Sequence, residues 1–197
     1  MAILTHAFFS RDTLVVAREL LGKRLVRCCR GQRLSGMVVE TEAYLGASDS
    51  ASHAFRGRTA RNSVMFGPAG TAYVYLVYGM HHMLNVTTDA EGVAGAVLLR
   101  AIKPLEGIDK MTALRSGTRR GLADGPGKLC RALAVDLSLR GIDLTSGEKL
   151  WFETYRDGPS TDIVCGPRVG IAYASPVDRQ APWRFQVAPT VLDGPPK

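Results

Sequence analysis

The segment VVETEAYLG, residues 38–46, joins the pattern of a buried β-strand to two acidic side chains. Its paired valines favour a strand, because β-branched residues have a high strand propensity. Side chains two positions apart on a strand lie on the same face of the sheet, so Glu40, Glu42 and Tyr44 are predicted to line one face. Two carboxylates beside a phenol on an apolar strand need either arginine partners or a chemical role.

The residues before this segment predict the other arm of a β-hairpin. Residues 23–29 alternate loosely as a strand, residues 30–33 have the composition of a turn, and residues 34–44 return as the second strand. An amphipathic helix is predicted ahead of the hairpin, with Ser10 as its N-cap and Gly22 as its end. The hairpin therefore carries the two acids on its second arm.

The rest of the chain predicts an α+β fold. Residues 46–70 are rich in Gly, Pro, Ser and Arg, and they predict a long basic loop with room for a short helix. Strands, then helices, then strands with hairpin connections are typical of an α+β domain with a mostly antiparallel sheet. We expect a single domain over residues 1–197, with residues 193–197 frayed. The predicted strands are residues 71–78, 83–88 and 96–102 (ending at Pro104) and shorter ones near 148–155, 168–174 and 183–188; the predicted helices are residues 105–116 and 126–135, the second with Asp124 as its cap and Pro126 in its first turn.

The composition fits one globular domain with a basic surface. The chain has 197 residues, of which 46% are hydrophobic and 22% charged, and this is enough apolar material for a core. The net charge of +7 and the pI of about 9.5 indicate an anionic partner, with nucleic acid first and an acidic membrane surface second. A basic surface kept for solubility is an equal alternative. No apolar run approaches the ~20 residues of a membrane span, and the first residues lack the pattern of a signal peptide.

The cysteines and histidines predict neither a metal site nor a disulfide framework. No two cysteines have C-x-x-C spacing, and the histidine spacings match no metal pattern. Reduced thiols in a cytoplasmic protein are the expected state, with no metal and no cofactor. The cysteines are Cys28, Cys29, Cys130 and Cys165.

The two acids allow two kinds of chemistry or none. A carboxylate on an apolar strand with aromatic neighbours can act as a general base that activates water. Two carboxylates at one site also resemble the pair used in glycoside hydrolysis. The alternative is that both acids pair with arginines or satisfy backbone groups. By pattern alone, a functional and a structural role for Glu40 and Glu42 are equally favoured.

The segment TAYVYLVYG, residues 71–79, places tyrosines on both faces of a predicted strand. Tyr73 and Tyr75 share a face, where they can either pack within the sheet or stack on a planar ligand. Tyr78 lies at the strand end beside Gly79, and a tyrosine at a hairpin tip of a basic protein can wedge into a duplex. Ordinary sheet packing is the default interpretation of such a cluster.

Basic residues are spread over the predicted loops and helix ends, where they suit contacts with phosphate. Any one of them can equally be solvated surface. The Gly-Pro-Gly-Lys run at residues 125–128 lacks the spacing of a phosphate-binding loop, although the helix N-terminus there can hold a DNA phosphate. The candidates are Arg56, Arg58, Arg61, Arg100, Lys103, Arg115, Arg119, Arg120, Lys128 and Arg131.

Several long segments resemble those of the alkyladenine (3-methyladenine) DNA glycosylases. They are ETEAYLG, ASHAFRGRTARN, MFGPAGTAYVYLVYGMHHMLNV, AVLLRAIKPLEG, DGPGKLCRALAVD, RVGIAYA and PWRFQV. They occur in the same order as in that family and extend from about residue 10 to about residue 188. The resemblance implies a curved sheet flanked by helices, with a protruding β-hairpin that enters DNA.

The resemblance implies a role for each matching residue of a base-binding pocket. It places the general base at Glu42. It places Tyr44 and His53 at pocket positions that stack on or contact the flipped base, and Tyr75 at the stacking position on the opposite wall. Asn85 matches the residue that crowds the exocyclic amine of normal guanine.

The resemblance also implies contacts with DNA. Tyr78 matches the tyrosine that fills the gap left in the helix, and Arg100 matches a basic residue near the phosphate of the flipped nucleotide. Glu40 is left with a supporting role, such as pairing with an arginine. The candidates for further phosphate contacts are Arg56, Arg58 and Lys128.

The implied activity is that of a monofunctional DNA glycosylase in base-excision repair. Such an enzyme flips an alkylated or deaminated purine (3-methyladenine, 7-methylguanine, hypoxanthine or ethenoadenine) out of duplex DNA. A water activated by the glutamate then hydrolyses the N-glycosidic bond and leaves an abasic site. The implied partner is double-stranded DNA with damaged purines, without metal, cofactor or membrane. The expected form is a monomer in the cytoplasm, near the nucleoid, or in the nucleus of a eukaryote.

Three other functions fit parts of the same pattern. A non-catalytic module that binds nucleic acid needs the basic surface and the tyrosines but not Glu42. A hydrolase of free nucleosides has no use for a net charge of +7 or for Tyr78. A bifunctional glycosylase uses an amine nucleophile, which borohydride traps as an enzyme–DNA adduct.

Overall fold

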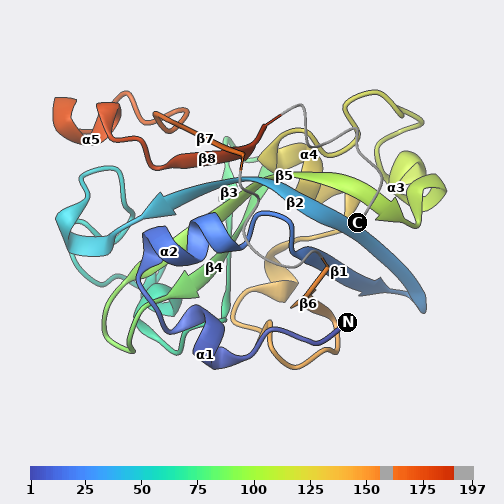
Figure 1. Ribbon diagram of the computed structural model, residues 1–197, viewed down its shortest axis with the longest axis horizontal. Coiled ribbons are helices and arrows are strands. Elements are labelled where there is room, and N and C mark those ends of the chain that lie inside the picture. The colour runs from blue at the N-terminus through green and yellow to red at the C-terminus, as the bar shows by residue number, and fades with distance from the viewer. Residues whose placement is uncertain (156–161, 189–197) are drawn as a thin grey trace.

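Strand β2 (Gln32–Tyr44) is the centre of an antiparallel sheet in the computed structural model, which describes residues 1–155 and 162–188 (Figure 1). It pairs with β5 along one edge, and with β1 and then β8 along the other. The strand order is β3–β4–β5–β2–β1–β6, and β7 pairs with β8. The predicted α+β fold with a mostly antiparallel sheet is thus confirmed. The other strands are β1 (Arg24–Cys29), β3 (Ala72–Val77), β4 (His81–Thr88), β5 (Gly95–Glu106), β6 (Leu150–Glu153), β7 (Ile163–Gly166) and β8 (Arg184–Val187).

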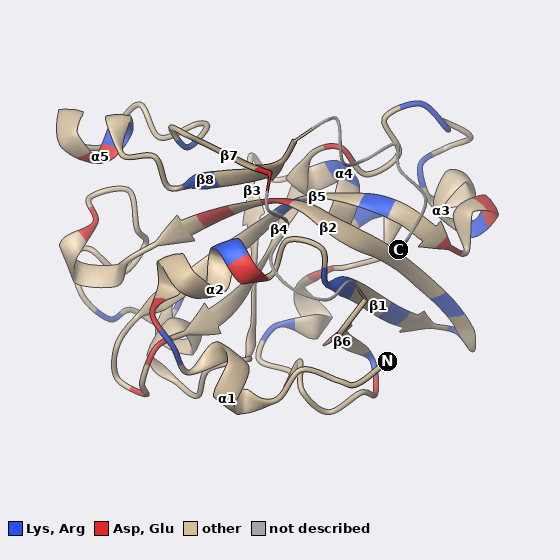
Figure 2. Cartoon of the chain, in the orientation of Figure 1, with Lys and Arg blue, Asp and Glu red and all other residues tan. Residues whose placement is uncertain are grey.

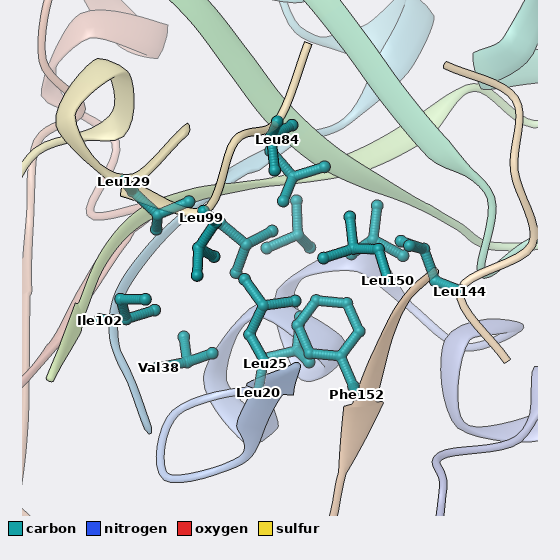
Figure 3. Packing of buried hydrophobic residues seen from close by; sticks show 14 of the residues in the cluster. Leu20, Leu25, Val38, Leu84, Leu99, Ile102, Leu129, Leu144, Leu150 and Phe152 are labelled. Atoms are coloured by element: carbon teal, nitrogen blue, oxygen red, sulfur yellow. The ribbon is translucent and has the colours of Figure 1, made fainter. Parts of the chain in front are cut away.

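Short helices pack against this sheet and enclose the main apolar core. Leu20, just after helix α2, and Leu129 on helix α4 meet leucines of the strands in one cluster (Figure 3). The α-helices are α1 (His6–Phe9), α2 (Thr13–Glu19), α3 (Ile108–Leu114), α4 (Pro126–Ala132) and α5 (Pro176–Gln180), and the 3-10 helices are η1 (Gly46–Ser48), η2 (Ser63–Phe66) and η3 (Leu137–Leu139).

Alternation along the strands gives the sheet two different faces. On β3, Val74 is buried in the main core, whereas Tyr73 belongs to a second cluster with the η2 residue Met65. On β4, Leu84 is in the main core and the next residue, Asn85, lines a pocket. Since successive side chains of a strand point to opposite faces, the strands that bury aliphatic residues on one side present polar and aromatic groups on the other.

Two predicted helix caps are wrong. Asp12, and not Ser10, caps α2, because its carboxylate accepts hydrogen bonds from two backbone N–H groups of the first turn. The hydroxyl of Ser10 instead binds a carbonyl of α1. Gly125 is the N-cap residue of α4, and Asp124 forms an ion pair with Lys128. In both cases the polar side chain has a competing partner close by.

Two predictions about strands are also wrong. Strand β5 does not end at Pro104 but continues through it. The described pairing of β4 with β5 ends at Leu98, so the missing N–H of Pro104 interrupts no ladder on that edge, and the register with β2 shifts near Gly36. The predicted strand at residues 168–174 is an irregular segment that follows β7.

The predicted single domain over residues 1–197 and its frayed end at residues 193–197 extend outside the described residues. Within the described ranges, no helix is long and apolar enough to cross a membrane. All four cysteines lie in the described part of the chain and are free thiols there.

Candidate active site

A pocket of about 530 Å³ opens on the face of the sheet opposite the main core. A volume of this size is typical of small-molecule sites. Four neighbouring strands and two irregular segments line it, so it depends on the whole curved sheet and not on one motif. Its lining includes Tyr44 of β2, Tyr73 and Tyr75 of β3, Asn85 of β4, Leu98 and Arg100 of β5, His53 of the loop after β2, and Val169 and Tyr173 of the irregular segment.

Glu42 lies fully buried directly behind this lining. The hydroxyl of Tyr44 donates a hydrogen bond to its Oε2 at 2.9 Å. The backbone N–H of Val169 donates to its Oε1 at 2.8 Å, and Nη1 of Arg100 lies 3.3 Å from the same oxygen. All three partners line the pocket. The carboxylate is therefore one layer of atoms from the cavity, and the expected pairing of Glu42 with Tyr44 on one face is confirmed.

The surroundings of Glu42 act on its charge in opposite directions. Burial raises the pKa of the carboxyl group above its ordinary value. The Arg100 guanidinium, the N–H of Val169 and the hydroxyl of Tyr44 each lower this pKa, because each stabilises the ionised form. The net direction is upward. A carboxyl group with a raised pKa is a better proton acceptor than an exposed glutamate.

Glu40 and Glu42 share one arginine. Nε of Arg100 donates a hydrogen bond to Oε1 of Glu40 at 2.9 Å, and Arg184 lies 3.5 Å from the same oxygen. The prediction that Glu40 pairs with an arginine is confirmed. Arg100 is thereby held between two carboxylates, and only 13% of its side chain is exposed. Its contact with a DNA phosphate stays a prediction.

Three rings form one wall of the pocket, and His53 and Tyr75, which were expected on opposite walls, are in contact within it. The His53 and Tyr75 rings are 4.6 Å apart edge to face, and Tyr73 and Tyr75 are 5.4 Å apart. Nδ1 of His53 is 2.9 Å from the Tyr73 hydroxyl. Burial, followed by the nearby Arg61, lowers the pKa of His53, and burial raises the pKa of both tyrosines. The wall is therefore uncharged near neutral pH.

Asn85 narrows the pocket from the β4 side. Its side chain is almost fully buried, and Nδ2 donates a hydrogen bond to the carbonyl of Tyr73 at 3.0 Å. This bond fixes the rotation of the amide, so Asn85 presents a defined shape to whatever occupies the cavity.

Tyr78 lies at the tip of the β3–β4 hairpin, with 90% of its surface exposed. Its φ of +51° is in the left-handed region, which is costly for a bulky residue, and Gly79 follows with φ +68°. Met80, the next residue of the turn, is 70% exposed. Because an exposed side chain gains little from packing, this strained and apolar tip indicates a role outside the folding of the chain.

The predicted phosphate-binding residues lie on the loop after β2 and on helix α4. Arg56 and Arg58 are exposed on the loop after β2, and Arg58 also stacks over the Phe66 ring at 5.9 Å. Lys128 is on the first turns of α4, where Gly127 lies against His81 at the start of β4. The contact of these side chains with DNA stays a prediction.

Sequence reasoning missed the contribution of the segment at residues 168–174. Val169 contributes a backbone N–H, Arg168 is buried against Asp49, and Tyr173 lines the pocket. The apolar residues of this segment favour a strand, and no local pattern indicates that Arg168 has a buried partner. Asp49 was missed because its partner is 119 residues away.

Comparisons with known proteins agree on one family. A family model described as "Methylpurine-DNA glycosylase (MPG)" matches residues 7–190. A protein of Methanocella arvoryzae is 48% identical over 188 residues, which cover 94% of this chain and 92% of the relative. A protein of Carboxydothermus hydrogenoformans is 48% identical, with 93% and 94% covered, and one of Clostridium perfringens is 45% identical, with 93% and 95% covered. All three are named "Putative 3-methyladenine DNA glycosylase".

Proposed function

The chain belongs to the methylpurine-DNA glycosylase family, and we propose that its pocket receives an alkylated or deaminated purine flipped out of duplex DNA. It is a DNA glycosylase, a hydrolase that cleaves the N-glycosyl bond between base and sugar. The observation that carries the proposal is the buried carboxylate of Glu42, held by three groups that all line an aromatic pocket. The proposed substrates are 3-methyladenine, 7-methylguanine, hypoxanthine and ethenoadenine.

The aromatic wall supports binding of a planar and often cationic base. Tyr44, His53 and Tyr75 offer ring faces and edges to a purine, and the uncharged state of these rings avoids repulsion. A purine alkylated at a ring nitrogen carries a positive charge, which aromatic faces attract. Asn85 restricts the remaining space and is proposed to exclude the exocyclic amine of guanine.

Glu42 is proposed to act as the general base. The water oxygen forms a bond to the anomeric carbon of the sugar while the carboxylate accepts a proton from that water. The N-glycosyl bond breaks, and its electron pair leaves with the base. A cationic alkylated base departs as a neutral molecule, whereas a neutral base such as hypoxanthine also needs a proton. The water is proposed to reach the carboxylate from the pocket side, where Tyr44, Val169 and Arg100 line the cavity and a carboxylate has acceptor sites beyond those that they use.

The hairpin and the basic surface are proposed to hold the duplex. Tyr78 enters the stack and occupies the space of the extruded base, which reduces the cost of flipping. Arg56, Arg58 and Lys128 contact phosphates, and Arg100 lies near the phosphate of the flipped nucleotide. The net charge of +7 adds affinity that does not depend on sequence. We propose that the chain acts as a monomer.

A monofunctional reaction is favoured over one that uses an amine. In the described part of the chain, no lysine lines the pocket. Borohydride treatment during the reaction is therefore expected to trap no enzyme–DNA adduct. A trapped adduct would show an amine nucleophile and would contradict the hydrolytic route.

The function is tested by release of free base from duplexes that each carry one lesion. We expect chromatography to detect the free base from at least one of the four lesions, and no release from an undamaged duplex or a free nucleoside. Tight binding of every duplex without release would favour the non-catalytic module. Release from free nucleosides at a similar rate would favour a nucleoside hydrolase.

A further inference from the structure

We propose that Arg168, held by Asp49, is a positioning residue that sets the place of two groups on Glu42, the Tyr44 hydroxyl and the Val169 N–H. The inference rests on the proposed function, because it assumes that Glu42 is the general base. Neither Arg168 nor Asp49 contacts the carboxylate of Glu42. Both act through the residues that do.

The two charged side chains form a closed pair. Both are fully buried, and the guanidinium meets both oxygens of the carboxylate, with Nη1 at 2.5 Å and Nη2 at 2.8 Å. Asp49 also accepts hydrogen bonds from the backbone N–H groups of Leu45 and Ala51. The carboxylate thus fixes the loop that follows β2 and orients Arg168 at the same time.

Arg168 in turn contacts the residues around Glu42 on both sides. Its guanidinium lies between two rings, 4.7 Å from the centre of Tyr44 and 4.8 Å from that of Trp183. Nη1 donates to the carbonyl of Ala43 at 2.9 Å, between Glu42 and Tyr44 in the chain. The residue after Arg168 is Val169, whose N–H binds Glu42. One planar group therefore fixes the Tyr44 ring and the backbone of Val169 together.

A gain in folding stability is a weak explanation for the buried ion pair between Arg168 and Asp49. Removing two charges from water costs much of what their attraction returns, so buried ion pairs are often no more stabilising than apolar residues of similar size. Nε of Arg168 is buried and makes no hydrogen bond to any described residue. The planar guanidinium group of arginine is suited to orienting its neighbours, because it can form two hydrogen bonds to a carboxylate while its faces stack on aromatic rings.

The test compares Arg168→Lys with Arg24→Lys. Lysine keeps the charge but has neither the fork nor the flat surface. Arg24 is also a nearly buried arginine in an ion pair, with Glu106, but it lies on β1 away from the pocket. The measured quantity is the single-turnover rate constant with enzyme in saturating excess, because an unfolded fraction lowers the active concentration and not this constant.

We expect Arg168→Lys to lower this rate constant about 10- to 100-fold, since a small misplacement of a catalytic group has effects of this size. The acidic limb of the pH profile of this rate constant should move to higher pH in the variant. The hydrogen bonds from the Tyr44 hydroxyl and the Val169 N–H favour ionised Glu42, and the variant loses both. The other charged groups facing Glu42, Arg100 on β5 and Glu40 on β2, are unchanged. Tyr75 and Tyr173 also face it and stay neutral.

Support requires both the lower rate and the shifted limb, with Arg24→Lys unchanged in both. Any other combination overturns the inference. If Arg168→Lys does not fold, Asp49→Asn is judged by the same criterion, and failure of both to fold assigns the pair to structure alone. Failure of the proposed function is distinguishable, because the unmodified protein would then release no base. If this inference alone fails, the unmodified protein still releases base.

Discussion

Glu42 combines a position that favours protonation with partners that favour charge. Burial raises its pKa, whereas Arg100, the Val169 N–H and the Tyr44 hydroxyl oppose that rise. A general base needs this balance, because it must accept a proton in the transition state and still be ionised beforehand. The apolar strand and the arginine are therefore both required, and this answers why an acid lies on such a strand.

Replacing Glu42 by Gln is expected to stabilise the fold increasingly as pH rises. The folded-state pKa is raised, so the contribution of Glu42 to stability is fully present below its unfolded-state pKa and is lost as pH rises through the folded-state pKa. Gln does not titrate. The free energy of unfolding of Glu42→Gln, measured by urea denaturation, should therefore gain on the parent as pH rises above the unfolded-state pKa of about 4.3.

Glu106→Gln is the control with the opposite sign. A hydrogen bond from Arg24, foremost among several contacts, lowers the pKa of Glu106, so its contribution is present above its unfolded-state pKa and is lost as pH falls. The effect is small because Glu106 is almost half exposed. Parallel pH trends for the two variants would contradict the raised pKa of Glu42.

Asn85→Ser is expected to shift lesion preference toward guanine derivatives. The shorter side chain removes the amide that is fixed on the Tyr73 carbonyl and opens space on that side of the pocket. The ratio of 7-methylguanine to hypoxanthine excision should rise roughly ten-fold, which is typical for a change in one pocket contact. Thr88→Ser, on the same strand but hydrogen-bonded to Thr13, is the control. An unaltered ratio would remove Asn85 from selectivity.

At this scale the sequence predicts where side chains lie on a strand better than it predicts their partners. Period-two alternation is enough to place Glu42 beside Tyr44. It does not predict that Val169 acts through its backbone, because an N–H has no side-chain pattern. It also does not link Asp49 to Arg168, since only the folded sheet brings the two segments together.

Among the elements, the β3–β4 hairpin has backbone strain at its tip. Tyr78 adopts a left-handed conformation that Asn or Gly adopts at less cost, and its ring makes little use of the fold. Strain of this kind persists where function requires the side chain. The strained and exposed Tyr78 therefore supports the proposed wedge role of this residue.

Tyr78→Asn is expected to stabilise the protein by about 1 kcal/mol and to weaken base flipping. The gain is measured by urea denaturation, and flipping by the fluorescence of ethenoadenine in a duplex on binding. Tyr173→Asn makes the same change at a residue without positive φ and should not stabilise. A flipped fraction equal to that of the parent would refute the wedge role of Tyr78.

The strands were predictable where one face is apolar, and less so where tertiary contacts decide. Alternation predicted β1 to β4 to within a few residues. Proline chemistry suggested that β5 would stop at Pro104, but the pairing with β4 ends at Leu98, so the missing N–H interrupts no ladder there. The apolar run at residues 168–174 resembles a strand, yet the buried Arg168 makes it turn toward Asp49.

For the molecule as a whole, the basic residues are spread over many more elements than those that line the pocket. Lys and Arg residues occur along β1 and around α3 and α4 (Figure 2), and Arg61 and Arg100 line the pocket. The net charge of +7 therefore predicts attraction to DNA without predicting which side chains contact it. The salt dependence of binding separates contacts from general attraction, because only ions released at phosphate contacts contribute to its slope.

Removing one phosphate-contacting cation should reduce the slope of log affinity against log salt by about 1. We expect this for Arg56→Gln, Arg58→Gln and Lys128→Gln, measured by fluorescence anisotropy on an undamaged duplex. Arg30→Gln is the control, because the β1–β2 turn is roughly 30 Å along β2 from Glu42. Equal changes in all four variants would mean that DNA is held by net charge alone.

The most direct test of Glu42 as the general base is the single-turnover release of hypoxanthine from a duplex by Glu42→Gln in saturating excess. The predicted rate constant is about 10² to 10⁴ times lower than that of the parent, with duplex affinity retained. Glu106→Gln should keep the parent rate. A Glu42→Gln rate within a factor of about ten of the parent would contradict the central claim.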